Sequence, residues 1–126
     1  MATDAREKYQ AAERRGHASE SLAALWLTLK GYRILARRLK TRAGEIDLVA
    51  AAPFGPVCFI EVKARETAGS AAQSVAPAQQ TRIARAASLY LAGRPQLSRR
   101  GARIDIIAIG ARALPVHHRD VWRADI

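Results

Sequence analysis

Charged side chains interrupt two apolar, strand-like segments of the chain. Glu45 and Asp47 lie in "GEIDLVA", and Glu61 and Lys63 lie in "VCFIEVKAR". A "PFGP" turn joins the segments, so an antiparallel hairpin can bring Asp47, Glu61 and Lys63 side by side if the pairing register allows it. Carboxylates that converge repel each other and are costly to desolvate, so a cation is their natural partner.

Magnesium or manganese suits such carboxylates best, because hard ions prefer oxygen ligands. The ion could activate a water molecule and stabilise charge on a phosphate, while Lys63 could orient or deprotonate that water or neutralise the phosphate. Zinc is disfavoured, since the chain has one cysteine and the adjacent His117 and His118 would point to opposite faces of a strand. Alone, the Glu-x-Lys motif is usually a solvated charge pair, and "GEID" could be turn chemistry with charges at a strand end. Their occurrence on consecutive strands of a basic chain favours a site.

The periodicity of apolar residues predicts a first helix from about Asp4 to Lys30. Gly16 is a candidate interruption, and Gly31 ends the pattern as a C-terminal glycine does. The apolar stripe of this helix consists of Ala18, Leu22, Leu25 and Leu29. Glu20 lies off the stripe, so periodicity alone predicts an exposed glutamate.

Strands and a second helix follow in an order typical of an α/β protein. The predicted strands are 32–39, 45–51, 57–64, 102–110 and a short edge strand within 114–124. The second helix is predicted over 78–92, with Pro77 in its first turn and Ser74 as a candidate N-cap. Without a repeat or linker, this order predicts a single domain over residues 1–126, with a central mixed sheet flanked by helices.

Strand alternation assigns side chains to the two faces of the predicted sheet. In the second strand it groups Glu45, Asp47 and Val49 opposite Ile46, Leu48 and Ala50. Asp105 interrupts the apolar fourth strand, and a buried acid needs a partner, so we expect a structural ion pair with Arg103 or a neighbouring arginine. Cys58 is expected to be a small core residue.

The charge of the chain points to nucleic acid as a partner. Lys and Arg number 21 against 11 Asp and Glu, a formal net charge of +10, which favours a polyanion-binding surface. No apolar run approaches the ~18 residues of a membrane span, so no membrane partner is expected. The charged N-terminus lacks the apolar core of a secretory signal, and with a single cysteine this predicts a cytoplasmic protein.

The chain resembles the YraN-like family of small bacterial proteins, which are similar to the restriction-endonuclease-like superfamily near the archaeal Holliday junction resolvases. The resemblance covers most of the chain, through "GHASESLAALWLTLKGYRIL", "GEIDLVA", "FIEVKAR", "RIARAASLYLAG" and "RIDIIAI". It implies a three-layer restriction-endonuclease-like domain that hydrolyses phosphodiester bonds in DNA, at branched or distorted structures, from a PD-(D/E)xK-type site. A homodimer is also implied, because resolvases act as two-fold pairs.

The resemblance also implies roles for individual residues. Asp47, Glu61 and Glu20 would hold Mg²⁺ or Mn²⁺, Lys63 would handle the attacking water, and Glu45 belongs to the supporting "GEID" signature. The arginines expected to bind the nucleic acid are Arg42, Arg65, Arg82 and Arg85. One departure concerns the start of the second helix, where a basic residue is expected and this chain has Gln79.

Two further functions stay open at this point: a nucleic-acid-binding module that keeps the fold without cutting, and a structural subunit of a DNA-processing complex. Mg²⁺ binding would separate the nuclease from both. Salt-dependent binding to DNA would separate the first two functions from the third.

Overall fold

The computed structural model describes residues 2–64, 77–110 and 114–122. Its helices and strands are α1 (Ala2–Leu29), β1 (Arg33–Thr41), β2 (Gly44–Ala51), β3 (Val57–Ala64), α2 (Pro77–Ala92), α3 (Pro95–Ser98), β4 (Ala102–Ile109) and β5 (Val116–Trp122). The predicted order is confirmed, and Pro77 opens α2 as expected. The short helix α3 was not predicted, and the candidate N-cap Ser74 lies outside the described residues.

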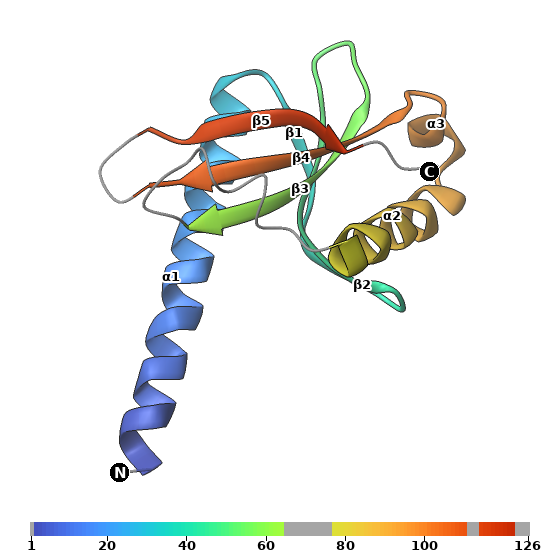
Figure 1. Cartoon of the computed structure of the whole chain (residues 1–126). Helices are drawn as coiled ribbons and strands as arrows, with labels where there is room; N and C mark the ends of the chain where they lie inside the picture. The colour runs from blue at the N-terminus through green and yellow to red at the C-terminus, as the bar shows by residue number, and fades with distance from the viewer. Residues whose placement is uncertain (1, 65–76, 111–113, 123–126) are drawn as a thin grey trace.

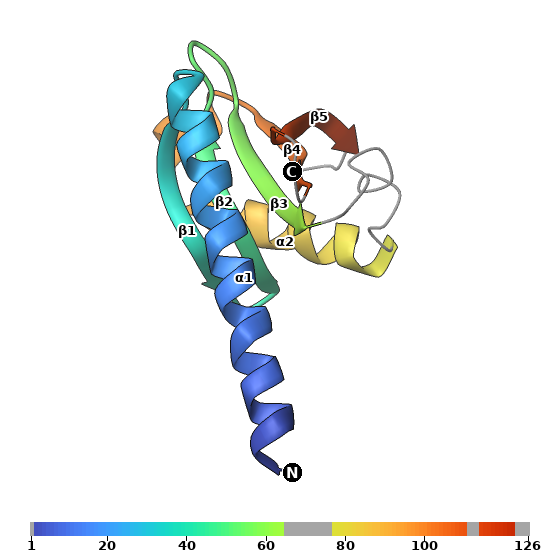
Figure 2. The ribbon, with the colours of Figure 1, turned by 90° about the vertical axis from the view of Figure 1, so that its left-hand side faces the viewer.

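The strands form one mixed sheet in the order β1-β2-β3-β4-β5. Neighbouring strands are antiparallel except for β3 and β4, which are parallel and therefore need a crossover, and α2 lies within that connection. Figures 1 and 2 show α1 and α2 on opposite sides of the strands. This α/β arrangement is consistent with the predicted three-layer, restriction-endonuclease-like fold. Among the described helices, none has the length and apolar character to cross a membrane.

Each face of the sheet buries its own apolar cluster. On the α1 side, Ala23 and Leu27 belong to a cluster that includes Leu48 and Ile60 of the sheet, and Cys58 is buried there as predicted. On the α2 side, the predicted apolar face of the helix is confirmed: Ile83, Ala87, Tyr90 and Leu91 are all buried. The two clusters hold the central strands β2 and β3 between the helices.

The orientation of α1 differs from the prediction. The helix continues without a break through Gly16, where an added Cβ would meet open space. Leu22, Leu25 and Leu29 of the apolar stripe are exposed by 41%, 54% and 73%, whereas Glu20 is buried at 4%. The physical reason is that α1 approaches the sheet through its small residues and Leu27, and that apolar spacing identifies a stripe without identifying which face meets the sheet.

The predicted alternation of β2 also fails at one point. Ile46 packs in the α2-side cluster with Val49, while Leu48 packs in the α1-side cluster, so the side chains do not alternate strictly between residues 46 and 49. The neighbouring Arg38 of β1 has a φ of 49°, which indicates an irregular backbone beside this segment. Asp47 lies at this irregularity, where simple strand periodicity no longer assigns the face of a side chain.

Candidate active site

Strands β2 and β3 stop pairing just before the predicted acidic residues. Their antiparallel ladder runs from Ala51↔Val57 to Leu48↔Ile60. One step further, the backbone N–H of Val62 donates to Oδ2 of Asp47 at 2.8 Å, so a side-chain carboxylate takes the place of a backbone acceptor. This bond holds Asp47 against β3 and next to Glu61.

Asp47 and Glu61 form a pair of carboxyl groups, of which Glu61 is buried and Asp47 is half-buried. Burial and the charge of Asp47 raise the pKa of Glu61 to about 8, partly opposed by Lys63. Burial also raises the pKa of Asp47, although the hydrogen bonds from Val62 and Glu61 oppose that rise. Near neutral pH the protein without metal therefore keeps a proton on Glu61, which donates it in a hydrogen bond to Asp47. A divalent cation could replace that proton.

Two donors lie beside the same oxygen of Glu61. Lys63 Nζ is 3.8 Å from Oε2, and the Nε2 amide of Gln79 donates to Oε2 at 2.9 Å. Gln79 sits in the first turn of α2, so the start of this helix reaches the acidic pair. Because Pro77 marks the first turn of the second helix, the sequence predicts that Gln79 lies near a helix start. It does not predict the contact with Glu61, which depends on how α2 packs against the sheet.

Glu20 of α1 lies near this site but is held by arginines. Its Oε1 lies 3.5 Å from Arg37 Nε and 3.8 Å from Arg38 Nε, and accepts no hydrogen bond from the described residues. Glu20, Glu45 and Asp47 line one pocket of about 250 Å³. No three acids, histidines or cysteines within residues 2–64, 77–110 and 114–122 converge as metal ligands, so Glu20 as a ligand stays a prediction.

The described arginines among the predicted nucleic-acid contacts lie on α2 and in the turn between β1 and β2. Arg42, in the turn between β1 and β2, is exposed, and so are Arg82 and Arg85 on α2. An added Cβ at Gly44 would lie 3.7 Å from Cβ of Arg82, which places Arg82 beside the turn that carries Arg42. Arg65 lies outside the described residues.

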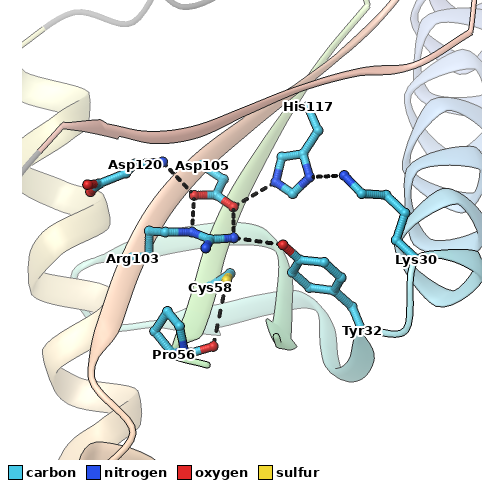
Figure 3. A network of polar contacts seen from close by, with 8 residues as sticks. All are labelled: Lys30, Tyr32, Pro56, Cys58, Arg103, Asp105, His117 and Asp120. Atoms are coloured by element: carbon cyan, nitrogen blue, oxygen red, sulfur yellow. Dashed lines mark hydrogen bonds and ion pairs between the residues drawn. The ribbon is translucent and has the colours of Figure 1, made fainter. Parts of the chain in front are cut away.

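A separate polar network surrounds Asp105, which is fully buried (Figure 3). Arg103 donates through Nε and Nη2 to both carboxylate oxygens at 2.9 Å, which confirms the predicted ion pair. His117 Nε2 lies 2.7 Å from Asp105, and His117 Nδ1 lies 2.8 Å from Lys30 Nζ at the end of α1. Burial raises the pKa of Asp105, but the hydrogen bonds from His117 and Arg103 outweigh burial and leave the pKa lowered. The network fastens the end of α1 to β4 and β5, which is a structural role.

Comparisons with known proteins agree with the resemblance seen in the sequence. The profile of the uncharacterised protein family UPF0102 matches residues 19–109, which include Glu20, Asp47, Glu61 and Lys63. The UPF0102 protein amb4503 of Paramagnetospirillum magneticum is 50% identical over 121 residues, covering 93% of each chain. The UPF0102 protein Atu0303 of Agrobacterium fabrum is 50% identical over 123 residues, covering 97% of this chain and 100% of the relative. With most of its length matched in this way, the chain belongs to the UPF0102 family, whose members are the YraN-like proteins.

Proposed function

We propose that this protein is a metal-dependent endonuclease that hydrolyses phosphodiester bonds in DNA, at branched or distorted structures. One observation carries the proposal: the carboxyl groups of Asp47 and Glu61 lie together where the β2–β3 ladder ends, Glu61 is buried, and Lys63 Nζ lies 3.8 Å from Glu61 Oε2. Such a pair is costly for stability, and perturbed acids of this kind gather at functional sites.

The acidic pair fits Mg²⁺ or Mn²⁺. Mg²⁺ is commonly held by one or two carboxylates, with waters and substrate phosphates completing its shell, so Asp47 and Glu61 are sufficient protein ligands. Burial and the charge of Asp47 raise the pKa of Glu61 to about 8 although Lys63 opposes the rise, so a divalent cation would favour the ionised pair. Glu20 is a proposed further ligand, because its Oε1 is buried and accepts no hydrogen bond from the part of the chain that is described.

The neighbouring residues would prepare this site for phosphate chemistry. When bound, the ion would polarise the scissile phosphate and acidify a water molecule. Val62 fixes Asp47, and Gln79 fixes Glu61, so both carboxylates are oriented before a ligand arrives. Lys63, whose side chain is 20% exposed, can donate to the attacking water or to a phosphate oxygen.

Binding to DNA would be electrostatic. The net charge of +10 and the exposed Arg42, Arg82 and Arg85 supply phosphate contacts. Such contacts position a duplex without reading its sequence, so the protein would select DNA by structure. A homodimer would present two acidic pairs to one branched DNA, as resolvases do by their two-fold symmetry.

A nucleic-acid-binding module without catalysis is the second candidate function. The observation that favours it is the engagement of Glu20 by Arg37 and Arg38, which draws this acid into ion pairs. In that case the charge of the chain would serve binding alone, and Mg²⁺ would leave the protein unchanged.

Purified protein, incubated with four-way, nicked, single-stranded and duplex DNA in Mg²⁺, Mn²⁺ or EDTA, tests the proposal. We expect cleavage with either ion, none with EDTA, and none by Lys63→Met. Arg99→Ala is the matched control, because Arg99 is an exposed charge that lies away from the acidic pair. It precedes β4, and the first residue of β4 pairs with Val57 at the start of β3, four residues before Glu61. Absence of cleavage of every DNA, or equal cleavage by Lys63→Met, would contradict the proposal.

A further inference from the structure

A fully exposed aromatic side chain stands at the end of the β2–β3 hairpin that lies away from the acidic pair. Phe54, in the turn between these strands, is 109% exposed. Its φ is 51°, in the left-handed region that a bulky residue rarely adopts. The chain therefore keeps a phenyl ring in water on a strained backbone, and because such strain clusters at ligand-binding sites, Phe54 is a candidate contact residue.

The turn that carries Phe54 is clamped on both sides. Arg100 donates through Nε to the carbonyl of Gly55 at 2.9 Å and through Nη2 to the carbonyl of Ala52 at 2.6 Å. On the other side, Pro53 packs on Gly31, where an added Cβ would lie 3.2 Å from Pro53 Cγ. Figure 2 shows the turn beside the end of α1. The backbone of the turn that carries Phe54 is thus held in place before any ligand arrives, which lowers the entropy lost on binding.

Phe54 borders a pocket of about 690 Å³ whose charged lining is entirely basic. Arg33 and Arg100 contribute the guanidinium groups, and the rest of the lining is apolar or glycine. A ligand that matches this surface has a flat face for the ring and a negative charge for Arg33. A nucleotide has both, because its base stacks on aromatic rings and its phosphate pairs with arginine.

We propose that Phe54 and Arg33 form a docking site for an unpaired nucleotide of a nucleic-acid strand, with Arg100 holding the turn in place. The proposal rests on the nucleic-acid binding of the proposed function and is independent of metal and cleavage. Phe54 lies seven positions after Asp47 in the chain, so the docking site is at most roughly 23 Å from the acidic pair. A single strand leaving the acidic pair covers that span in roughly seven stacked nucleotides.

The test measures binding of the full chain in EDTA, so that cleavage plays no part. Fluorescence anisotropy follows labelled 12-nucleotide single-stranded DNA, single-stranded RNA of the same sequence, and the duplex, each across a salt series. The variants are Phe54→Ala, Phe54→Trp, Arg33→Ala and Leu114→Ala. Leu114 is the matched control, because it is 72% exposed and does not line the pocket.

Stacking and charge leave different signatures in this experiment. Phe54→Ala should weaken single-strand binding roughly tenfold with an unchanged salt slope, since stacking releases no counterions. Arg33→Ala should reduce the slope on single strands by about 0.7. Phe54→Trp should retain the wild-type affinity for single strands. Leu114→Ala should bind every nucleic acid as wild type does, and Phe54→Ala should bind the duplex with wild-type affinity. The DNA and RNA arms identify which strand the site prefers.

Two results would overturn the docking site. If wild type binds and Phe54→Ala binds single strands equally well, the docking site is wrong while the proposed function stands. If Phe54→Ala weakens duplex and single-strand binding alike, the ring does not stack on an unpaired base. Thermal unfolding of each variant in the same buffer checks that the fold is intact.

Discussion

The Nε2 amide of Gln79 donates a 2.9 Å hydrogen bond to Oε2 of Glu61, the oxygen that also lies 3.8 Å from Lys63 Nζ. A neutral donor at this position orients the acid and adds no positive charge that would compete with a cation. A lysine here would place an ammonium on Glu61 instead, where it would compete with a divalent ion. The glutamine found in place of the expected basic residue therefore affects the capacity of the acidic pair to bind a cation.

Gln79→Lys should accordingly weaken metal binding. We expect a smaller Mg²⁺-dependent rise in melting temperature than in wild type, and a DNA-binding salt slope that is not steeper. Ala78→Lys is the matched control, because it adds the same charge at an exposed position of the same helical turn. A slope steeper by about one unit for Gln79→Lys, with normal metal stabilisation, would show that residue 79 contacts phosphate.

The raised pKa of Glu61 predicts a pH dependence of stability. The pKa of Glu61 is about 8 in the folded, metal-free protein, against about 4.5 ordinarily. Between these values the folded state binds more protons than the unfolded state, so the contribution of Glu61 to stability is complete below 4.5 and is lost as pH rises through 8. Melting temperatures in EDTA from pH 5 to 9 should therefore fall more steeply for wild type than for Glu61→Gln.

Glu7→Gln is the control for this pH series, since Glu7 is an exposed glutamate on α1. It should reproduce the wild-type pH dependence. Mg²⁺ affinity should rise with pH over the same window, because binding must expel the proton. Parallel curves for wild type and Glu61→Gln would show that Glu61 titrates normally in the folded protein.

The structural network around Asp105 predicts the opposite behaviour from the acidic pair. Asp105→Asn removes the charge that Arg103 and His117 surround, and breaking a buried ion pair costs about 3 kcal/mol of unfolding free energy. The Mg²⁺-dependent stabilisation should stay as in wild type. Urea unfolding with and without Mg²⁺ measures both quantities. An unchanged unfolding midpoint for Asp105→Asn would show that the network around Asp105 does not stabilise the fold.

Much of the fold follows from local patterns, whereas the site depends on tertiary packing. The hairpin around "PFGP" and the helix after Pro77 follow from turn chemistry and apolar spacing, and the structure confirms both. The burial of Glu20 could not be predicted, because apolar spacing favoured the leucine stripe of α1 as the helix's interacting face. The contact between Gln79 and Glu61 joins residues 18 positions apart across two elements, and no local pattern reports such a contact.

The observed orientation of α1 is itself testable with a matched pair of substitutions. Leu27 is fully buried, so Leu27→Ala should lower the unfolding free energy by about 2–5 kcal/mol. Leu25 is 54% exposed, so Leu25→Ala should change it by at most about 0.5 kcal/mol. Urea unfolding of both variants decides the matter, and a larger loss for Leu25→Ala would mean that the leucine stripe faces the sheet.

The central claim is that Asp47 and Glu61 are placed for a divalent cation at some cost to stability. Thermal unfolding of wild type and Asp47→Asn, each in EDTA and in excess Mg²⁺, tests it most directly. The side-chain carbonyl of asparagine can still accept the N–H of Val62, so in EDTA the variant should melt at or above the wild-type temperature. Mg²⁺ should raise the melting temperature of wild type, because a ligand that binds only the folded state stabilises it, and should leave Asp47→Asn unchanged. A variant that is destabilised in EDTA, together with a wild type whose melting ignores Mg²⁺, would contradict the claim.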